Sequence, residues 1–282
     1  MTRLFVLIAL SFGFAGAAFA GCAGKLASAS AQGQLTYSPF AAWNAQQTLM
    51  LTVQNTGTSP CAYQVSVPPA YYPLQFGGKI SFSLSALGGA VAAANLTLTT
   101  PVIKPNQSAQ LPIVLTIPRG QPSLSGYFIS KLGFALTGAG APAAGSPIDQ
   151  AIMPLSCRVP PIFEINLAGS GIRSTVQFAS LETGQKAFVI LQTRTNGGHQ
   201  IVFRSLNGGF LALNGLSGPA STISYVADVD GQPVTLTAPV ALSFAAAPGE
   251  AARRLTVTVG DTTGKPAGTY TDVITVSILS SM

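Results

Sequence analysis

Charged residues are scarce in this sequence, and acidic residues are the scarcest. Only 8% of the 282 residues are Asp, Glu, Lys or Arg, against about a quarter in an ordinary globular protein. Between Gly21 and Ser146 there is no Asp or Glu, and the few cations are scattered. This argues against a nucleic-acid-binding protein. Two interpretations stay open: a sparsely charged module that its cations keep soluble, or a preference for anionic surfaces or glycans.

Residues that commonly carry catalysis or bind metals are also few. Histidine occurs once, at His199 beside an expected turn, so a His-dependent triad has one possible base and a solvent-exposed side chain is predicted. The sequence has no Gly-x-Ser-x-Gly segment and no Cys-x-x-Cys pair. Asp228 and Asp230 are interpreted as flanking a turn at Gly231. The sequence therefore predicts no enzyme, no cofactor and no metal site.

Only one apolar run has the composition of a targeting segment, and it lies at the N-terminus. Arg3 precedes the apolar residues 4–14, and Ala18-Phe19-Ala20 supplies a small-x-small cleavage pattern. Residues 1–20 are therefore predicted to be an export signal, too short for a retained membrane helix. Processing as a lipoprotein at Cys22 stays open as an alternative.

Hydrophobic residues make up 48% of the chain, and Gly, Pro, Ser and Thr are abundant. This composition favours short strands joined by tight turns, and it is unlike that of a disordered chain. Several segments alternate apolar and small polar residues, the pattern of a sheet with one buried face. The roughly 260 residues after the signal suit two domains of ordinary size.

The two halves of the sequence repeat one another. Residues 113–117 and 255–259 are alternating segments, and at the same offset the next strands also match. The matched positions are Gly126 with Gly268, Phe128 with Tyr270, Leu132 with Ile274, Phe134 with Val276, Leu136 with Ile278 and, within a residue of that offset, Asn55 with Asn196. Several matches in order at nearly constant spacing indicate duplication of one module.

The predicted fold is all-β, with two tandem immunoglobulin-like β-sandwich modules of about seven strands each. The first module is predicted over residues 21–145, a linker over 146–160 and the second module over 161–282. Expected strands of the second module include residues 163–167, 175–178 and 269–278.

Three cysteines follow the predicted signal, and an exported protein can oxidise them. Cys22 precedes the first expected strand and Cys61 begins a later one. A Cys22–Cys61 disulfide is favoured because it ties the N-terminal edge to the core, which leaves Cys157 unpaired. If Cys22 carries a lipid, Cys61 with Cys157 becomes the natural pair.

The second half carries several short motifs that occur together in one known family. They are VQF at 176–178, LETG at 181–184, RTNGG at 194–198, SLNGG at 205–209 and PAGTYTD at 266–272. With these motifs the second half resembles the spore coat protein U domain, the pilin-type module of archaic chaperone–usher pili. Ala179 stands where the family usually has Gly, and the family's cysteine pair is missing from this half.

The resemblance implies a mechanism of assembly. Such subunits are incomplete sandwiches that a periplasmic chaperone first completes, and a strand of a neighbouring subunit later replaces it at the outer-membrane usher. This is β-augmentation, with main-chain hydrogen bonds and alternate apolar side chains from the donor strand. The resemblance therefore implies that the second module is incomplete and unstable alone, and that the chain reaches the cell surface in a pilus.

A subunit that donates needs alternating apolar side chains at its N-terminus, and residues 21–30 offer only Leu26 as a sizeable one. This favours a tip adhesin that supports attachment to an abiotic or host surface, or biofilm formation. The alternatives are a shaft or minor pilin, and a free-standing secreted module that binds carbohydrate or another surface component.

The best candidates for contact with a target are exposed aromatic residues of the first half. The loop of residues 68–78 holds Tyr71, Tyr72, Leu74 and Phe76 among prolines, and Trp43 is a second candidate. An aromatic loop is costly to expose unless it meets a partner. The alternative is that these side chains close the end of the sandwich or the domain interface.

Overall fold

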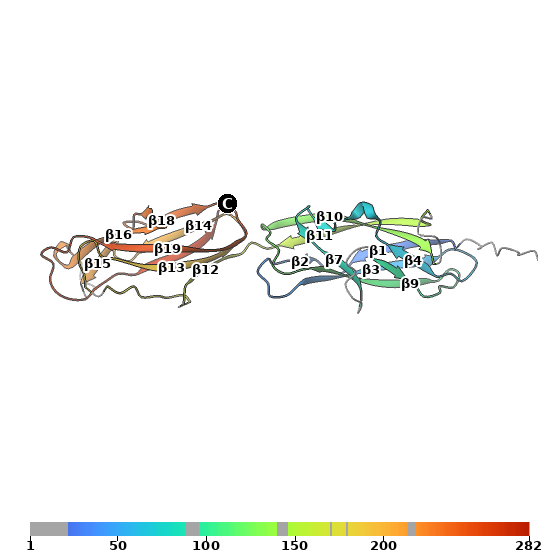
Figure 1. Cartoon of the computed structure of the whole chain (residues 1–282), viewed down its shortest axis with the longest axis horizontal. Helices are drawn as coiled ribbons and strands as arrows, with labels where there is room; N and C mark the ends of the chain where they lie inside the picture. The colour runs from blue at the N-terminus through green and yellow to red at the C-terminus, as the bar shows by residue number, and fades with distance from the viewer. Residues whose placement is uncertain are drawn as a thin grey trace, which may run out of the picture.

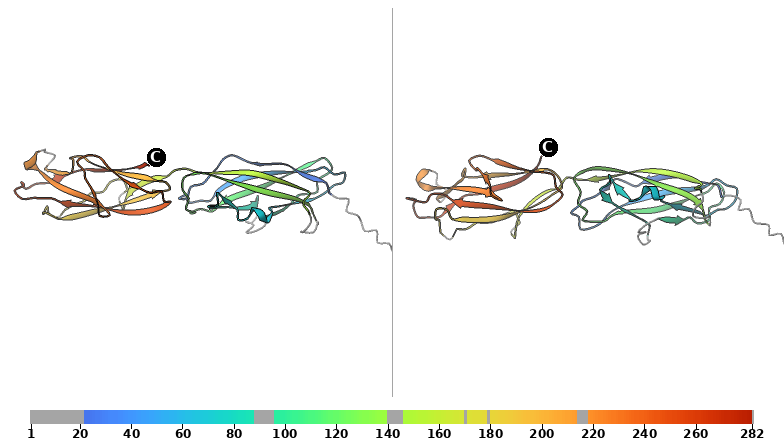
Figure 2. Two further views of the ribbon diagram at one scale, coloured as in Figure 1. Left: turned by 90° about the horizontal axis from the view of Figure 1, so that it is seen from above. Right: turned by 45° about the horizontal axis from the view of Figure 1, so that its top comes forward.

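The computed structural model describes residues 22–87, 96–139, 146–169, 171–178, 180–213 and 218–281. The predicted export signal lies outside these ranges. Two β-sandwiches follow one another along the long axis of the molecule (Figures 1 and 2). In the described ranges, no helix has both the length and the apolar composition needed to cross a bilayer.

The first domain is a sandwich of two sheets, with strand orders β1-β3-β9-β7 and β2-β11-β10-β4-β8, beside a small β5-β6 ribbon. All the paired strands run antiparallel except β2 with β11, which run parallel. The elements are β1 (Gly24–Ala31), β2 (Leu35–Thr36), β3 (Ala45–Asn55), β4 (Tyr63–Ser66), the 3₁₀ turn η1 (Pro69–Tyr71), β5 (Gln75–Phe76), β6 (Ile80–Ser81), β7 (Ser83–Ala86), β8 (Thr97–Thr99), β9 (Ser108–Ile117), β10 (Gly126–Gly138) and β11 (Asp149–Val159).

The second domain is also a sandwich of two sheets, and among the described residues the sheet that holds β21 has only three strands. Its sheets have the orders β12-β13-β19-β16-β15-β20, with β17 beside β16, and β18-β14-β21. The elements are β12 (Phe163–Leu167), β13 (Lys186–Thr195), β14 (His199–Ser205), β15 (Phe210–Leu213), the 3₁₀ turn η2 (Pro219–Ser221), β16 (Thr222–Val229), β17 (Gln232–Val234), β18 (Val240–Phe244), β19 (Gly249–Val259), β20 (Tyr270–Thr271) and β21 (Ile274–Ser280).

Alternation along the strands explains how each core forms. In β3, Leu49, Leu51 and Val53 are fully buried, and the residues between them, Met50 and Thr52, are half-buried on the opposite face. Successive side chains of a strand point to opposite faces, so one face of β3 enters the core. The all-β prediction is confirmed, and residues 163–167 form a strand as expected. Residues 175–178, also predicted as a strand, have no regular structure.

The predicted linker over residues 146–160 is wrong for most of its length. Residues Asp149–Val159 form β11, which pairs with β10 along its whole length. Met153, Leu155, Cys157 and Val159 alternate into the core and are at most 3% exposed, so this segment belongs to the first sandwich. The connection between the domains is only Pro160, Pro161 and Ile162.

Two buried asparagines at matching repeat positions fix the turns at the domain ends. The Asn55 Nδ2 donates to the carbonyls of Ser59 and Ile103, each at 2.8 Å, and its Oδ1 accepts from the Gly57 N–H at 2.9 Å. Asn196 binds the connection between the two domains: its Nδ2 donates to the Pro160 carbonyl at 2.9 Å, and its Oδ1 accepts from the Ile162 N–H at 2.7 Å.

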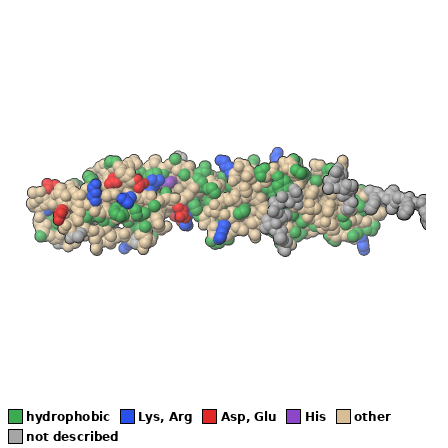
Figure 3. Space-filling model, in the orientation of Figure 1, with side chains coloured by type: hydrophobic (Ala, Val, Ile, Leu, Met, Phe, Trp, Pro, Cys, Tyr) green, Lys and Arg blue, Asp and Glu red, His purple; other side chains and the backbone are tan. Residues whose placement is uncertain are grey.

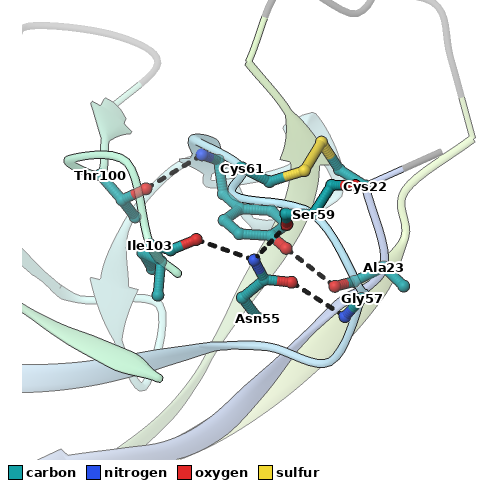
Figure 4. The surroundings of a disulfide bond; sticks show 9 residues. Cys22, Ala23, Asn55, Gly57, Ser59, Cys61, Thr100 and Ile103 are labelled. Atoms are coloured by element: carbon teal, nitrogen blue, oxygen red, sulfur yellow. Dashed lines mark hydrogen bonds between the residues drawn. A yellow bond between two sulfur atoms is a disulfide. The ribbon is translucent and has the colours of Figure 1, made fainter. Parts of the chain in front are cut away.

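The predicted disulfide between Cys22 and Cys61 is confirmed (Figure 4). Around it, the Tyr63 hydroxyl donates to the Ala23 carbonyl at 2.8 Å, and Cys61 N–H donates to the Ile103 carbonyl at 3.0 Å. The bond thus fixes the start of β1 to the end of the sandwich. Cys157 is a free thiol in the core, so the alternative Cys61–Cys157 pairing is wrong.

Replacing Cys22 and Cys61 by alanine should lower the free energy of unfolding of the first domain by about 4 kcal/mol, since the bond closes a loop of 39 residues. Chemical denaturation followed by far-UV circular dichroism measures this. The unmodified protein should lose the same stability in reductant, and the double variant should be insensitive to it. A variant as stable as the oxidised protein would contradict this role.

Candidate functional site: the edge strand of the second domain

The repeat makes β10 and β21 equivalent strands with different neighbours. Leu132, Phe134 and Leu136 of β10 match Ile274, Val276 and Ile278 of β21 in sequence. The sheets agree as well, because β10 pairs with β4 and β21 pairs with the corresponding β14. The other side of the two strands differs: β10 pairs there with β11, and β21 has no counterpart of β11 among the described residues.

In the first domain, β11 completes the core. The register places Met153 opposite Leu132, and it places the small residue Ala151 opposite the large residue Phe134. Under this cover Leu132 and Leu136 are 0% exposed and Phe134 is 1% exposed.

In the second domain, the matching side chains are not fully covered. Ile274, Val276 and Ile278 are each only half-buried, although they alternate with exposed residues on β21 as core residues do. Both Ile274 and Val276 pack against the second core. Within the described ranges, no strand gives the second core at this edge the apolar cover that β11 gives the first.

Strand β12 lies at the matching edge of the facing sheet. It pairs with β13 on one side, and within the described ranges no strand pairs with its other side. Ile165 and Leu167 pack against the second core and are half-buried, like the residues of β21. The half-buried apolar side chains of β12 and β21 form the candidate site, which we call the acceptor edge.

The half-buried carboxylate of Asp272 holds the start of β21 in place. Asp272 accepts hydrogen bonds from the Ser205 hydroxyl at 2.6 Å, from the Tyr225 hydroxyl, and from the Asn207 N–H at 3.0 Å. Burial first, and then the hydrogen bond to Asp272, raises the pKa of Tyr225 above its usual value, so the hydroxyl keeps its proton and donates. The SLNGG and PAGTYTD motifs thus anchor the start of β21, one of the two strands of the acceptor edge.

Most of the predicted contact residues are packed into the first domain. Phe76 is fully buried with its ring 4.8 Å from that of Phe82, so its predicted role in surface contact is wrong in this structure. Tyr71, Tyr72 and Leu74 are half-buried and pack against the first core. The Gly77–Gly78 turn, with positive φ at both glycines, folds this loop back onto the sandwich.

Tyr71 lies directly over the backbone of β10. A Cβ atom added at Gly133 would meet the Tyr71 ring at 2.1 Å, so only glycine allows this approach. The Tyr72 hydroxyl accepts a hydrogen bond from the Leu96 N–H at 3.3 Å. The Tyr71 ring therefore covers part of the outer face of β10.

Trp43 is the predicted contact residue with a largely free side chain, at 73% exposed. It lies in the loop between β2 and β3, where Arg119 donates to the Ala42 carbonyl at 2.8 Å. Phe40 of the same loop lies 5.5 Å below the guanidinium of Arg194 in the second domain. Trp43 is therefore near the junction of the two domains.

His199 is buried, which corrects the expectation of a solvated turn histidine. It begins β14, is 5% exposed and stacks on Phe244 at 5.2 Å. Burial lowers its pKa, and the positive charge of Arg253 lowers it further, so the ring is neutral near pH 7. Among the described residues no group of three or more His, Cys, Asp or Glu is placed to hold a metal ion.

Cys157 is a core residue of the first domain. Burial raises the pKa of its thiol to about 11, so it is a protonated, unreactive side chain near neutral pH. Its side chain is one of those with which β11 fills the first core.

Replacing Gly133 by alanine should destabilise the first domain by about 1–3 kcal/mol, because the new methyl group displaces the Tyr71 ring. The same substitution in a Tyr71→Ala background should cost far less. A double-mutant cycle measured by chemical denaturation gives this coupling. Additive effects would show that Tyr71 does not rest on Gly133.

No protein-family model matches this chain, and no curated protein matches it in sequence. Solved structures do match it. One chain in the structure of the CsuC–CsuE chaperone–tip adhesion subunit complex of Acinetobacter baumannii is 13% identical to this chain. The match covers 89% of this chain and 99% of that one, with a TM-score of 0.39. The CupB6 tip adhesin of Pseudomonas aeruginosa is 11% identical over 91% and 94%, with a TM-score of 0.37. The CFA/I adhesin CfaE of enterotoxigenic Escherichia coli is 11% identical over 93% and 82%, with a TM-score of 0.39.

Proposed function

We propose that this chain is the tip subunit of a chaperone–usher pilus, and that its second domain accepts a strand from another protein at the acceptor edge. The observation that carries the proposal is the difference between β10, which β11 covers, and its repeat counterpart β21, which has no such cover among the described residues. An unpaired strand edge beside half-buried apolar side chains is a site for β-augmentation.

The first domain supports the role of acceptor over that of donor. Strand β1 pairs with β3 from Gly24 to Ala31, and the disulfide at Cys22 fixes its start. This segment is therefore part of its own sandwich and is not free to enter a neighbour. A subunit that receives a strand and offers none from this segment suits the end of a fibre.

On this proposal the second module is a spore coat protein U-like pilin domain. It binds a periplasmic chaperone first. At the outer-membrane usher, a neighbouring pilin then replaces the chaperone. The disulfide suits an oxidising compartment on the way to the cell surface. The first domain then faces an abiotic or host surface and supports attachment or biofilm formation, with Trp43 as its most exposed aromatic side chain.

The structure of β11 also indicates what the incoming strand needs. In the first domain Ala151 lies opposite Phe134. In the second domain the residue that matches Phe134 is Val276. Since valine is smaller than phenylalanine, the incoming residue opposite Val276 should be larger than alanine. We expect an extended segment with apolar side chains at alternate positions.

A self-complemented chain tests the proposal. A copy of residues 140–159, the segment that follows Ala139 and contains β11, is appended after Ser281 in place of Met282, because Ser281 matches Ala139 in the repeat. In the copy, Cys157 is replaced by valine and Ala151 by leucine. The unfolding midpoint of the second domain should rise by about 5 °C or more in calorimetry, while that of the first stays unchanged.

The matched control carries serine at positions 151, 153, 155, 157 and 159 of the copy, which keeps the length and removes the inward-facing apolar side chains. It should give no increase. If neither chain raises the midpoint, or if the control raises it equally, the edge is not a strand acceptor. That result would favour a free-standing secreted binding module.

A further inference from the structure

The outer face of β10 and β11 exposes large apolar side chains next to cations. Tyr127 and Ile129 of β10 are 69% and 75% exposed, and Ile152 of β11 is 60% exposed. Lys131 and Arg158 on the same two strands are also exposed. We call these five residues the outer strip.

The register of the two strands places the strip on one face. Tyr127 stands opposite Arg158, whose guanidinium lies 5.9 Å from the centre of the tyrosine ring, and Gly133 stands opposite Ile152. Tyr127, Ile129 and Lys131 follow at every second position, so they point to the same side of the sheet. From Ile152 to Arg158 the strip is roughly 20 Å long at the rise per residue of a strand.

The fold does not require these apolar side chains. At the matching positions of the repeat, the second domain has Thr269 and Thr271 in place of Tyr127 and Ile129. Leu132 and its neighbours on the inner face of β10 already fill the core. Exposed apolar residues grouped on one face indicate a contact surface.

The charges around the strip have one sign. Asp149 is the single acidic residue between positions 22 and 159, and its carboxylate accepts from Leu26 N–H at 2.7 Å and Gln150 N–H at 2.8 Å. It lies at the end of β11 far from Arg158. The turn that carries Lys79 borders the strip, because Gly77 N–H donates to the Ile129 carbonyl at 3.1 Å. In the view of Figure 3, blue and green side chains but no red ones appear on the first domain.

We propose that the outer strip binds an anionic lipid surface. An open sheet face offers a broad contact instead of an enclosed pocket, as contact with a bilayer surface requires. Two isoleucines and a tyrosine can enter the boundary between headgroups and acyl chains, while lysine and arginine pair with anionic headgroups. An acidic glycan would use the same cations, and it could stack only on Tyr127, whose ring already faces the guanidinium of Arg158; the two isoleucines offer a glycan no ring. The strip is separate from the acceptor edge, so this inference does not depend on the proposed function.

Sedimentation of the chain from residue 21 with vesicles tests the inference. Vesicles of equal parts phosphatidylglycerol and phosphatidylcholine should bind the protein, and vesicles of phosphatidylcholine alone should bind it at least about fivefold more weakly. Ile129→Ser with Ile152→Ser should weaken binding about tenfold, and Lys131→Glu with Arg158→Glu at least about tenfold. Both positions of each pair are exposed, so the unfolding midpoint should not change.

Two matched controls separate the strip from the overall charge and hydrophobicity. Lys25→Glu with Lys104→Glu changes the net charge by the same amount on other strands and loops of the first domain, and Ile172→Ser with Val226→Ser removes exposed apolar residues of the second domain. These variants should keep most of the vesicle binding. Absence of binding to the anionic vesicles, equal loss in the controls, or capture by a sulfated polysaccharide without vesicle binding would each overturn the inference.

Discussion

A β-strand inside a sandwich needs two kinds of neighbour, a hydrogen-bonding strand at each edge and apolar atoms over its inward side chains. Strand β10 has both, because β4 and β11 flank it and β11 brings Met153 and Leu155 into the core. Strand β21 repeats β10 in sequence and has β14 on one side only, among the described strands. The two domains are thus an internal comparison of one strand with and without its neighbour.

This difference explains the unequal burial in the two cores. Residues buried almost completely in β10 correspond to half-buried residues in β21, although both strands alternate in the same way. The Asp272 cluster and the buried Asn196 nevertheless hold both ends of the second domain in order. The second domain is therefore a formed sandwich with one unfinished side, and the proposed assembly follows from how that side is completed.

Alternation and the repeat were enough to predict the two-sandwich fold and most long strands, and the position of Cys22 just before the first strand favoured the Cys22–Cys61 bond. They missed β11, although Met153, Leu155, Cys157 and Val159 alternate, because Pro154 and the Gly- and Ala-rich segment before it indicate a loop. Proline is tolerated there because β2 reaches only Cys157 and Arg158, which leaves most of the far edge of β11 without a partner strand.

The candidate site was predictable only in outline. The family resemblance implied an incomplete second module, but which strands border the gap depends on sheet order, and local sequence does not encode sheet order. The ring of Phe76 contacts Phe82, which follows the short β5-β6 ribbon. The ring of His199 contacts Phe244, which lies on β18, a strand distant in sequence. Such contacts are not visible in residue patterns.

Native-state hydrogen exchange of the full chain, read residue by residue, tests the central claim most directly. The amides of β10 that point toward β11, and those of Ala135–Gly138 that point toward β4, should exchange only through global unfolding of the first domain. The amides of β21 that point away from β14 should exchange many times faster than those that point toward it. Uniform protection along β21, equal to that of β10, would contradict the account, because it would mean that the edge is already covered.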